Sequence, residues 1–294
     1  MVFAEGFIAV DWGTSNRRAY RIGPGGDHVA EYEDSQGVLA VPAGGFADAV
    51  AEIRARLGDL PMILAGMVGS NRGWIEVPYV PCPAGFADLA AAVTWAEPGR
   101  TAIVPGLSLL SATRADVMRG EEVQLLGAVK AGLIPADGLA CHPGTHNKWV
   151  VIEGGSIASF RTVMTGELFD HVKRKGVLAD WLDRPVQDGD AFRAGVHEGL
   201  NGGAIGADLF AVRARILLGL ASAEDAASFT SGLLIGSDVG AGLADGDGPV
   251  TIIGRPDLTR LYAAALSVAG REHGEVDGED AFIGGVREIV RLLS

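Results

Sequence analysis

The sequence contains few cysteines and no long apolar segment. Only Cys82 and Cys141 occur among 294 residues, and neither has a CxxC or other metal-ligand spacing. Two thiols in a chain of this size are typical of a reducing compartment, although a single disulfide stays open. No apolar run approaches the roughly 18 residues of a membrane-spanning helix, and the first residues lack the basic region of a signal peptide. We therefore expect a cytoplasmic protein with no membrane partner.

Basic residues are also scarce. The chain has 24 Lys and Arg against 37 Asp and Glu, which gives a formal net charge of −13. Nucleic acids and anionic membranes bind basic surfaces, so neither is an expected partner. Any phosphate must then be bound locally, by loops, helix N-termini and metal. Because 48% of the residues are hydrophobic and glycine occurs 43 times, we expect a packed core with many sharp turns.

The segment Ile8–Ile22, IAVDWGTSNRRAYRI, indicates a strand, a tight polar turn and a second strand. The apolar first strand ends at Asp11, and the turn Gly13–Asn16 consists of small polar residues. Backbone N–H groups and hydroxyls of such a turn can bind phosphate oxygens, and the carboxylate beside them can hold Mg²⁺. On this segment alone, an ordinary Gly- and Ser-rich hairpin is an equal alternative.

A similar turn recurs about half a chain later. Gly13–Arg17 and Gly144–Lys148 share the pattern G-T-x-N followed by a basic residue, and each runs on into a strand. A duplicated strand–turn–strand–helix unit predicts two similar domains, each with a Gly-Thr turn, and 294 residues are enough for both. A chance match at three positions is the alternative.

The rest of the chain alternates short apolar strands with amphipathic helices, which indicates an α/β protein. The helices are expected at Phe46–Leu57, Phe86–Trp95, Thr165–Leu182, Ala191–Leu200, Gly203–Leu220, Pro256–Ala269 and Glu279–Leu293. Strands are expected at His28–Glu33, Pro61–Ala65, Thr101–Pro105 and Pro249–Gly254. Asp116–Lys130 indicates a loop entering a helix, and Gly270–Gly278 a loop. Phe229–Leu243 fits either a buried helix, which we favour, or a strand with a turn.

The motifs resemble those of a known group of proteins. DWGTSNRRAY and PGTHNKW are similar to the two phosphate motifs of the sugar kinase, heat-shock chaperone and actin superfamily, and IIGRPDLTRLY resembles its adenosine motif. Within that superfamily, the chain resembles the 2-dehydro-3-deoxygalactonokinase family. The further blocks that carry this resemblance are AGMVGSNRGWIEVPYVPCP, DVMRGEEVQLLGA, HPGTHNKWV with FRTVMTGELF, and SGLLIGSDV, in the family's order from Ile8 to about Ala269.

The resemblance implies an ATP-dependent kinase that phosphorylates 2-dehydro-3-deoxy-D-galactonate on its 6-hydroxyl in galactonate catabolism. It implies an actin-like ATPase fold, in which two ribonuclease H-like domains share an ATP cleft. Residues 1–135, joined by the last helix 279–294, would form the domain with the first phosphate motif and the substrate loop. Residues 136–278 would form the domain with the second phosphate and adenosine motifs.

The resemblance also assigns the cofactor residues. The first phosphate loop would comprise Asp11, Gly13, Thr14, Ser15 and Asn16, with Asp11 near Mg²⁺. The second would comprise Gly144, Thr145, His146 and Lys148, and Gly254 would lie against the adenosine. One departure is His142-Pro143, where many superfamily members have an Asp. The metal would then depend on Asp11 alone.

Phosphoryl transfer also needs a base for the attacking hydroxyl. Related sugar kinases place an acid shortly before the second phosphate motif, and Gly120-Glu121 resembles the Gly-Asp of glycerol-type kinases. Glu121 is therefore the first candidate, with Asp116 and Glu122 as alternatives. The alternative is that the glutamate has no catalytic role and only stabilises the N-terminus of its helix, where a negative charge is favourable.

The substrate carries a carboxylate, for which arginine is the natural partner, and hydroxyls that suit Asn and Ser. The long loop Gly66–Gly85 offers Ser70, Asn71, Arg72 and Trp74, and Arg161 is a second cationic candidate. Loop packing for the tryptophan and a surface ion pair for the arginine are the alternatives.

Other functions remain to be weighed. A hexokinase-like or N-acetylglucosamine kinase of the same superfamily is the nearest alternative. An actin- or chaperone-like nucleotide switch would need extra subdomains, for which the chain leaves little room. The sequence fixes neither the preferred epimer of the sugar acid nor the oligomeric state, for which a homodimer is one expectation.

Overall fold

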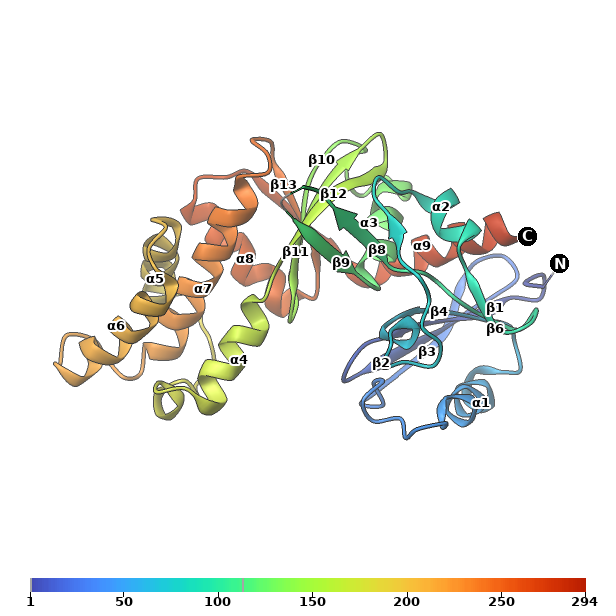
Figure 1. Ribbon diagram of the computed structural model, residues 1–294, viewed down its shortest axis with the longest axis horizontal. Helices are drawn as coiled ribbons and strands as arrows, with labels where there is room; N and C mark the ends of the chain where they lie inside the picture. The colour runs from blue at the N-terminus through green and yellow to red at the C-terminus, as the bar shows by residue number, and fades with distance from the viewer. Residues whose placement is uncertain (1, 113) are drawn as a thin grey trace. The chain divides into compact units, whose positions relative to one another are not determined.

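The computed structural model describes residues 2–112 and 114–294 (Figure 1). The chain forms two units. Unit 1 comprises Met1–Ala136, Ile152–Ser159 and Gly278–Ser294, and unit 2 comprises Asp137–Val151 and Phe160–Asp277. Each unit is built around its own sheet and hydrophobic core.

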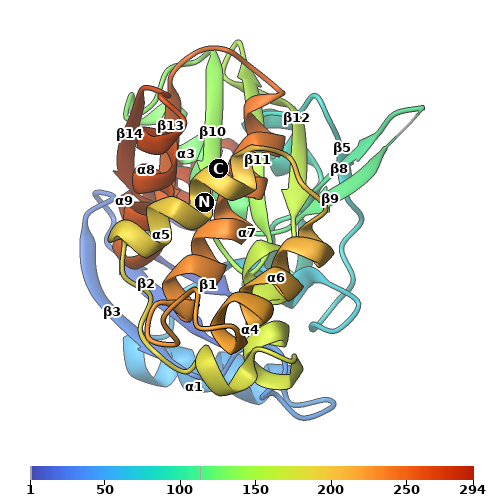
Figure 2. The same cartoon turned by 90° about the vertical axis from the view of Figure 1, so that its left-hand side faces the viewer.

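The main sheet of unit 1 has the strand order β3-β2-β1-β4-β7-β6. Its strands are β1 (Phe7–Trp12), β2 (Arg17–Ile22), β3 (His28–Asp34), β4 (Met62–Gly66), β6 (Thr94–Glu97) and β7 (Thr101–Ile103). Strand β1 runs antiparallel to β2 and parallel to β4. A small sheet is formed by β5 (Val80–Pro81), β8 (Leu107–Leu110) and β9 (Ala115–Met118), and Figure 2 shows the β8–β9 hairpin as an extended arm.

Helices of unit 1 cover this sheet. They are α1 (Phe46–Leu57), α2 (Phe86–Ala91), α3 (Glu121–Lys130) and α9 (Gly278–Leu293), with a 3₁₀ turn η1 (Met67–Gly69). Buried residues of α1 pack against the apolar side chains of β1 and β4 in one core. Helices α3 and α9 approach so closely that a Cβ on Gly127 would lie 2.0 Å from the carbonyl oxygen of Ala281. The last helix of the chain is therefore part of the unit that contains its first strand.

Unit 2 repeats the plan of unit 1. Its sheet has the strands β10 (Gly138–His142), β11 (Asn147–Glu153), β12 (Ser156–Val163), β13 (Val250–Gly254) and β14 (His273–Asp277), in the order β12-β11-β10-β13-β14. The end of β11 and the start of β12, within Ile152–Ser159, are counted with unit 1. Strand β13 runs parallel to both β10 and β14. Short turns join β10 to β11 and β11 to β12, which are neighbours in the sheet. These pairs must be antiparallel, because a parallel connection needs about a dozen residues or more. Both sheets thus place a three-stranded meander beside parallel strands.

The helices of unit 2 are more numerous. They are α4 (Thr165–Lys175), α5 (Asp190–Leu200), α6 (Ile205–Leu217), α7 (Ala226–Leu243) and α8 (Pro256–Val268), with a 3₁₀ turn η2 (Ala179–Trp181). Helix α7 confirms the favoured interpretation of its segment, and it is buried along most of its length. Within the described ranges, no helix is both long and apolar enough to cross a membrane.

Four predicted elements differ from the structure. The loop expected at the start of Asp116–Lys130 contains most of β9, because its residues pair with β8. The helix expected at Phe86–Trp95 ends at Ala91, and Thr94–Glu97 forms β6, because the β-favouring Trp95 pairs with β7. The loop expected at Gly270–Gly278 contains β14, whose partner β13 lies about twenty residues away and supplies no local signal. The helix expected at Thr165–Leu182 ends at Lys175, just before Gly176.

Candidate active site

Asp11 lies on β1, one residue before the end of that strand, opposite Arg18 on β2 and Ala65 on β4. Burial raises the pKa of Asp11 to about 6, Arg18 acts against this rise, and the charge of Glu121 adds to it. By its exposed area Asp11 is half-buried. A carboxylate at the end of a strand, near a second acid and opposed in part by Arg18, is a hard oxygen ligand. The donor chemistry therefore fits Mg²⁺.

The turn after β1 presents its backbone amides. Gly13 donates its N–H to the carbonyl of Asn16 at 2.9 Å and so closes the turn. The carbonyls of Gly13 and Thr14 accept the N–H groups of Val38 and Leu39 at 3.0 and 3.3 Å. Among residues 2–112 and 114–294, no acceptor is found for the N–H groups of Thr14 and Ser15. Adjacent unused amides in a tight turn form an anion-binding concavity.

Three chain segments meet at this end of the unit 1 sheet. Gly66, the last residue of β4, has φ +92°, and a Cβ there would lie 2.7 Å from the carbonyl oxygen of Trp12. Gly120, directly before α3, has φ +112°, and its Cβ would lie 3.1 Å from the Cα of Gly66. Only glycine combines this backbone conformation with such close approach. The first turn, the substrate loop and the acidic helix start are thereby brought together.

The three acidic candidates differ in their surroundings. Glu121 is half-buried, and its carboxylate accepts the backbone N–H of Arg119 at 3.1 Å. Glu122 is fully buried, both of its oxygens accept the N–H of Gly120 at 2.9 and 2.7 Å, and burial with the charge of Glu121 raises its pKa to about 8. Asp116 lies on β9, where its carboxylate accepts the N–H of Val117 at 2.8 Å. Glu121 is thus the acid whose charge reaches Asp11 while its side chain stays partly accessible.

The predicted substrate loop borders a cavity. Its volume is about 450 Å³, and it lies within unit 1. The lining residues are Val38, Leu39, Val41, Pro42, Ala43, Gly44, Phe46, Asn71, Arg72, Gly73 and Trp74. Arg72 is exposed, and within the described part of the chain it forms no ion pair. The cavity adjoins the first turn, because Val38 and Leu39 also hydrogen-bond to Gly13 and Thr14.

Ser70 is buried and is not among the residues that line the cavity. Its hydroxyl donates to the carbonyl of Met67 at 2.7 Å and accepts the N–H of Arg72 at 3.2 Å. These bonds shape the loop that carries Arg72.

Arg119 is a residue that the sequence analysis missed. It is buried, its Nη2 donates to the carbonyl of Val77 at 2.7 Å, and its guanidinium lies 4.2 Å from the centre of the Tyr79 ring. Nε and Nη1 find no acceptor among the described residues. Its position directly before Gly120-Glu121 was the available signal. Through its side chain and its backbone N–H, Arg119 links the substrate loop to Glu121.

The second turn lies at the corresponding place in unit 2, after β10. No acceptor is found within the described ranges for the N–H groups of Gly144, Thr145 and His146. The carbonyl of Thr145 accepts the N–H of Glu167 at 3.0 Å, and Nε2 of His146 lies 2.5 Å from the Glu167 carboxylate. A Cβ on Gly166 would lie 2.7 Å from the carbonyl oxygen of Gly144. The start of α4 therefore packs directly on the turn.

Two other elements of unit 2 belong to this site. Gly254, at the end of β13, lies beside Pro143, since a Cβ on it would be 3.8 Å from that residue. Parallel pairing of β10 with β13 places both strand ends at one edge of the sheet, where α/β proteins commonly bind ligands. Lys148 is buried, and its Nζ donates to the hydroxyl of Thr162 at 2.9 Å.

A buried carboxylate supports the second turn. Asp238 on α7 accepts hydrogen bonds from Asn147 Nδ2 at 3.0 Å, Trp149 Nε1 at 2.7 Å, and the hydroxyls of Thr165 and Tyr262 at 2.5 Å each. Burial raises the pKa of Asp238, and the four donors act against that rise. One side chain thus joins α7 to β11, α4 and α8. Asp238 lies in SGLLIGSDV, one of the blocks that resemble the family, but no role was predicted for it.

Two predicted residues are engaged elsewhere. The guanidinium of Arg161 forms a bidentate pair with Asp245 at 2.8 and 2.7 Å. Asn16 is exposed, and its amide lies 3.4 Å from Glu33, whereas the matching Asn147 is fully buried. The two copies of the motif therefore differ in the surroundings of their asparagine side chains.

Comparison with known proteins identifies the family. A family model described as 2-keto-3-deoxy-galactonokinase matches residues 11–289. The chain belongs to this family. Its sequence is 38% identical to the 2-dehydro-3-deoxygalactonokinase of Escherichia coli (strain K12) over 294 residues, which cover 98% of each chain. It is 36% identical to DgoK1 of Rhizobium meliloti (strain 1021), a protein assigned the same activity, over 100% of this chain and 99% of that one.

A solved structure agrees with this membership of the galactonokinase family. The crystal structure of a Sinorhizobium meliloti protein assigned as a 2-dehydro-3-deoxygalactonokinase superposes with a TM-score of 0.90. The two sequences are 35% identical, and the match covers 97% of this chain and 98% of that one. The predicted actin-like ATPase fold and the predicted sugar-acid kinase activity are therefore confirmed. Neither another class of small-sugar kinase nor a non-enzymatic nucleotide switch is supported.

Proposed function

We propose that this member of the galactonokinase family transfers the γ-phosphoryl group of ATP to the 6-hydroxyl of 2-dehydro-3-deoxy-D-galactonate, with Mg²⁺ as cofactor. The observation that carries the proposal is the pair of Gly-Thr turns, in each of which adjacent backbone amides lack an acceptor among the described residues. Turns of this kind bind phosphate oxygens. The cavity beside the first turn supplies a place for the acceptor sugar acid.

On the nucleotide side, the amides of Thr14 and Ser15 bind phosphate oxygens in unit 1, and those of Gly144 and Thr145 bind them in unit 2. Gly254 faces the adenosine. Asp11 would hold Mg²⁺, which would neutralise part of the phosphate charge during transfer. Burial raises the pKa of Asp11, and a cation beside the carboxylate would lower it again.

On the acceptor side, Arg72 binds the substrate carboxylate, while Asn71 and Trp74 contact its hydroxyls and carbon chain. Glu121 takes the proton of the 6-hydroxyl as that oxygen forms its bond to the γ-phosphorus and the bond from phosphorus to the departing ADP oxygen breaks. Glu122 remains protonated near neutral pH, because burial raises its pKa to about 8, and so it is poorly suited to accept that proton. Asp116 is the remaining alternative.

A coupled assay of ADP release tests the function. We expect turnover with 2-dehydro-3-deoxy-D-galactonate and much slower turnover with hexoses, and a panel that includes the gluconate epimer measures specificity at C4. Turnover of hexoses in place of the sugar acid contradicts the proposal.

Variants test the residue roles. We expect Glu121→Gln to lower kcat by roughly 10²–10⁴-fold, and Asp11→Asn to lower it severely with the fold intact. Arg72→Ala raises KM for the sugar acid more than KM for ATP. Arg184→Ala is the control, because Arg184 is an exposed arginine whose partner Glu224 lies 3.6 Å away in unit 2. An equal rise in both KM values places Arg72 outside the acceptor site.

We also propose a cytoplasmic location, which the two free thiols support, since Cys141 is buried and Cys82 is half-buried, and neither forms a disulfide in the described structure. A homodimer stays a proposal that light scattering of the purified chain can test.

A further inference from the structure

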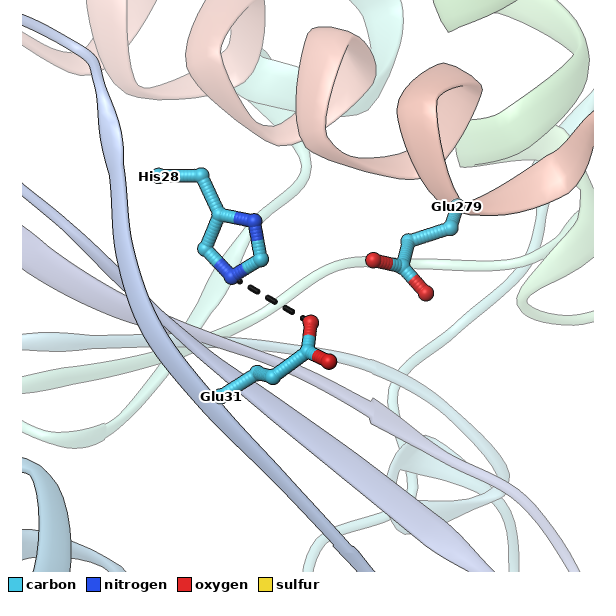
Figure 3. A group of neighbouring side chains, drawn as sticks. All are labelled: His28, Glu31 and Glu279. Carbon is cyan, nitrogen blue, oxygen red and sulfur yellow. Dashed lines mark ion pairs between the residues drawn. The ribbon is translucent and has the colours of Figure 1, made fainter.

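Three metal-ligating side chains converge at an edge of unit 1, away from the candidate active-site residues in sequence. They are His28 and Glu31 from β3 and Glu279 from the first turn of α9, and Figure 3 shows them pointing toward one another. We propose that they form a binding site for a divalent transition-metal ion of the Zn²⁺ class. Its ligands do not include Asp11, the residue proposed to hold Mg²⁺.

The spacing of the ligand atoms suits such an ion. Each side chain offers one ligand atom, and the three atoms lie within 4.8 Å of one another. Nε2 of His28 is 3.3 Å from an oxygen of Glu31. Tetrahedral zinc with bonds of about 2.1 Å places neighbouring ligand atoms about 3.4 Å apart. The His28–Glu31 pair already has this spacing, and a small side-chain movement brings Glu279 to it.

A strand irregularity creates the pair. Residues three apart on a regular strand point to opposite faces of the sheet, so His28 and Glu31 would be separated. The pairing of β2 with β3 shifts here: Arg21 is opposite Ala30, but Ile22 is opposite His28, and Val29 is skipped. Such a bulge reverses the alternation and brings His28 and Glu31 to one side.

The scaffold around the ligands is well packed. The ring of Tyr20 packs edge-on against the ring of His28, with 5.6 Å between the ring centres. Tyr20 also packs against Phe282 of α9, with 5.7 Å between the ring centres. Tyr20 is buried in the core, so the imidazole and the start of α9 are held by the same side chain. This packing fixes the distance across which a metal would join β3 to α9.

The donor set selects the kind of ion. One imidazole nitrogen with two carboxylate oxygens suits zinc and its first-row neighbours, whereas Mg²⁺ prefers oxygen ligands alone. The ligands are exposed or half-buried, so water can complete the coordination. The alternative is a protonated His28 that forms an ion pair with Glu31, in which case Glu279 is only a carboxylate favoured at a helix N-terminus.

The test uses the full chain without a histidine tag. Cobalt(II) serves as the spectroscopic probe, and Zn²⁺ is measured by its competition with cobalt. We expect one ion per chain, visible d–d absorption, and a rise in Tm of unit 1 with Zn²⁺. His28→Gln and Glu279→Gln should each weaken the affinity at least about tenfold, and their kinase rate with Mg²⁺ should be unchanged.

Two controls separate the metal site from the alternative. Asp280→Asn removes a neighbouring carboxylate from the same helix turn, and His273→Gln removes a histidine of β14. Both should bind cobalt like the original chain. Equal affinity in His28→Gln and the original chain, or an equal loss in Asp280→Asn and Glu279→Gln, overturns the proposal. Circular dichroism of each variant establishes that it is folded.

Discussion

Replacing Asp238 by alanine should strongly destabilise the protein. The carboxylate accepts hydrogen bonds from four side chains, all of them buried or nearly so. The hydroxyls of Thr165 and Tyr262 can rotate toward new acceptors, but the indole of Trp149 and the amide of Asn147 have fixed directions. A buried donor left without an acceptor costs about 1–3 kcal/mol. The two fixed donors alone therefore predict a loss of about 2–6 kcal/mol, which is a large share of a typical stability of about 5–15 kcal/mol.

Asparagine at position 238 should cost less. Its carbonyl oxygen can still accept from Trp149 and Asn147, and its amide can donate to the hydroxyl oxygens of Thr165 and Tyr262. We expect a loss of about 1–2 kcal/mol. Because Asn147 directly follows the second Gly-Thr turn, Asp238→Asn should also raise KM for ATP more than KM for the sugar acid.

Urea unfolding at 25 °C measures both variants, with the slope of free energy against urea checked for constancy. Tyr262→Phe is the matched control, since it removes one donor from the same carboxylate and should cost about 1 kcal/mol. A loss below about 1 kcal/mol for Asp238→Ala would mean that the network is not coupled to folding as described. Equal losses for the alanine and asparagine variants would mean that the buried donors are not what makes the alanine variant unstable.

Two further outcomes are expected. Burial raises the pKa of Glu122 from an ordinary 4.5 to about 8 in the folded chain. As pH rises, the unfolded chain therefore loses this proton before the folded chain does. The free energy of unfolding should then fall as pH rises from about 4.5 to about 8. The urea midpoint of Glu122→Gln should depend less on pH over this range, and parallel curves for the two proteins would contradict the assignment. Gly166→Ala should displace the second turn, because its Cβ would lie 2.7 Å from the carbonyl of Gly144, and should raise KM for ATP severalfold. Gly206→Ala is its control and should leave KM unchanged, because a Cβ there would meet no atom within 4 Å apart from its chain neighbours and its own helix backbone.

Local patterns predicted the elements that carry their own signals. Phe46–Leu57 has apolar residues at helical spacing, and α1 has the predicted bounds. The polar turn after the first strand was also predictable, because its glycine, threonine and serine follow directly on an apolar run. Strand β14 was not, since HGEVD lacks a continuous apolar pattern and forms a strand only through pairing with β13.

Side-chain environments were harder to predict than the backbone. Asn16 and Asn147 occupy equivalent places in the repeated motif, yet one is exposed and the other binds a carboxylate ninety-one residues away. The pair between Arg161 and Asp245 likewise joins residues eighty-four apart. The cavity wall at residues 38–46 gave no signal, because nothing in a single sequence places that loop against Asn71 and Trp74. Such contacts depend on tertiary packing, which sequence periodicity does not encode.

The division of unit 1 between the two ends of the chain imposes an order on biosynthesis. Helix α9 contacts α3 and supplies Phe282 against Tyr20, but it comprises residues 278–293 and is translated after the rest of unit 1 and after unit 2. Until α9 has been synthesised, α3 lacks the helix that packs against it at Gly127. Most of unit 2 has by then been synthesised and can fold first. A chain that stops before residue 278 would therefore carry both Gly-Thr turns and still leave the helix of Glu121 unsupported.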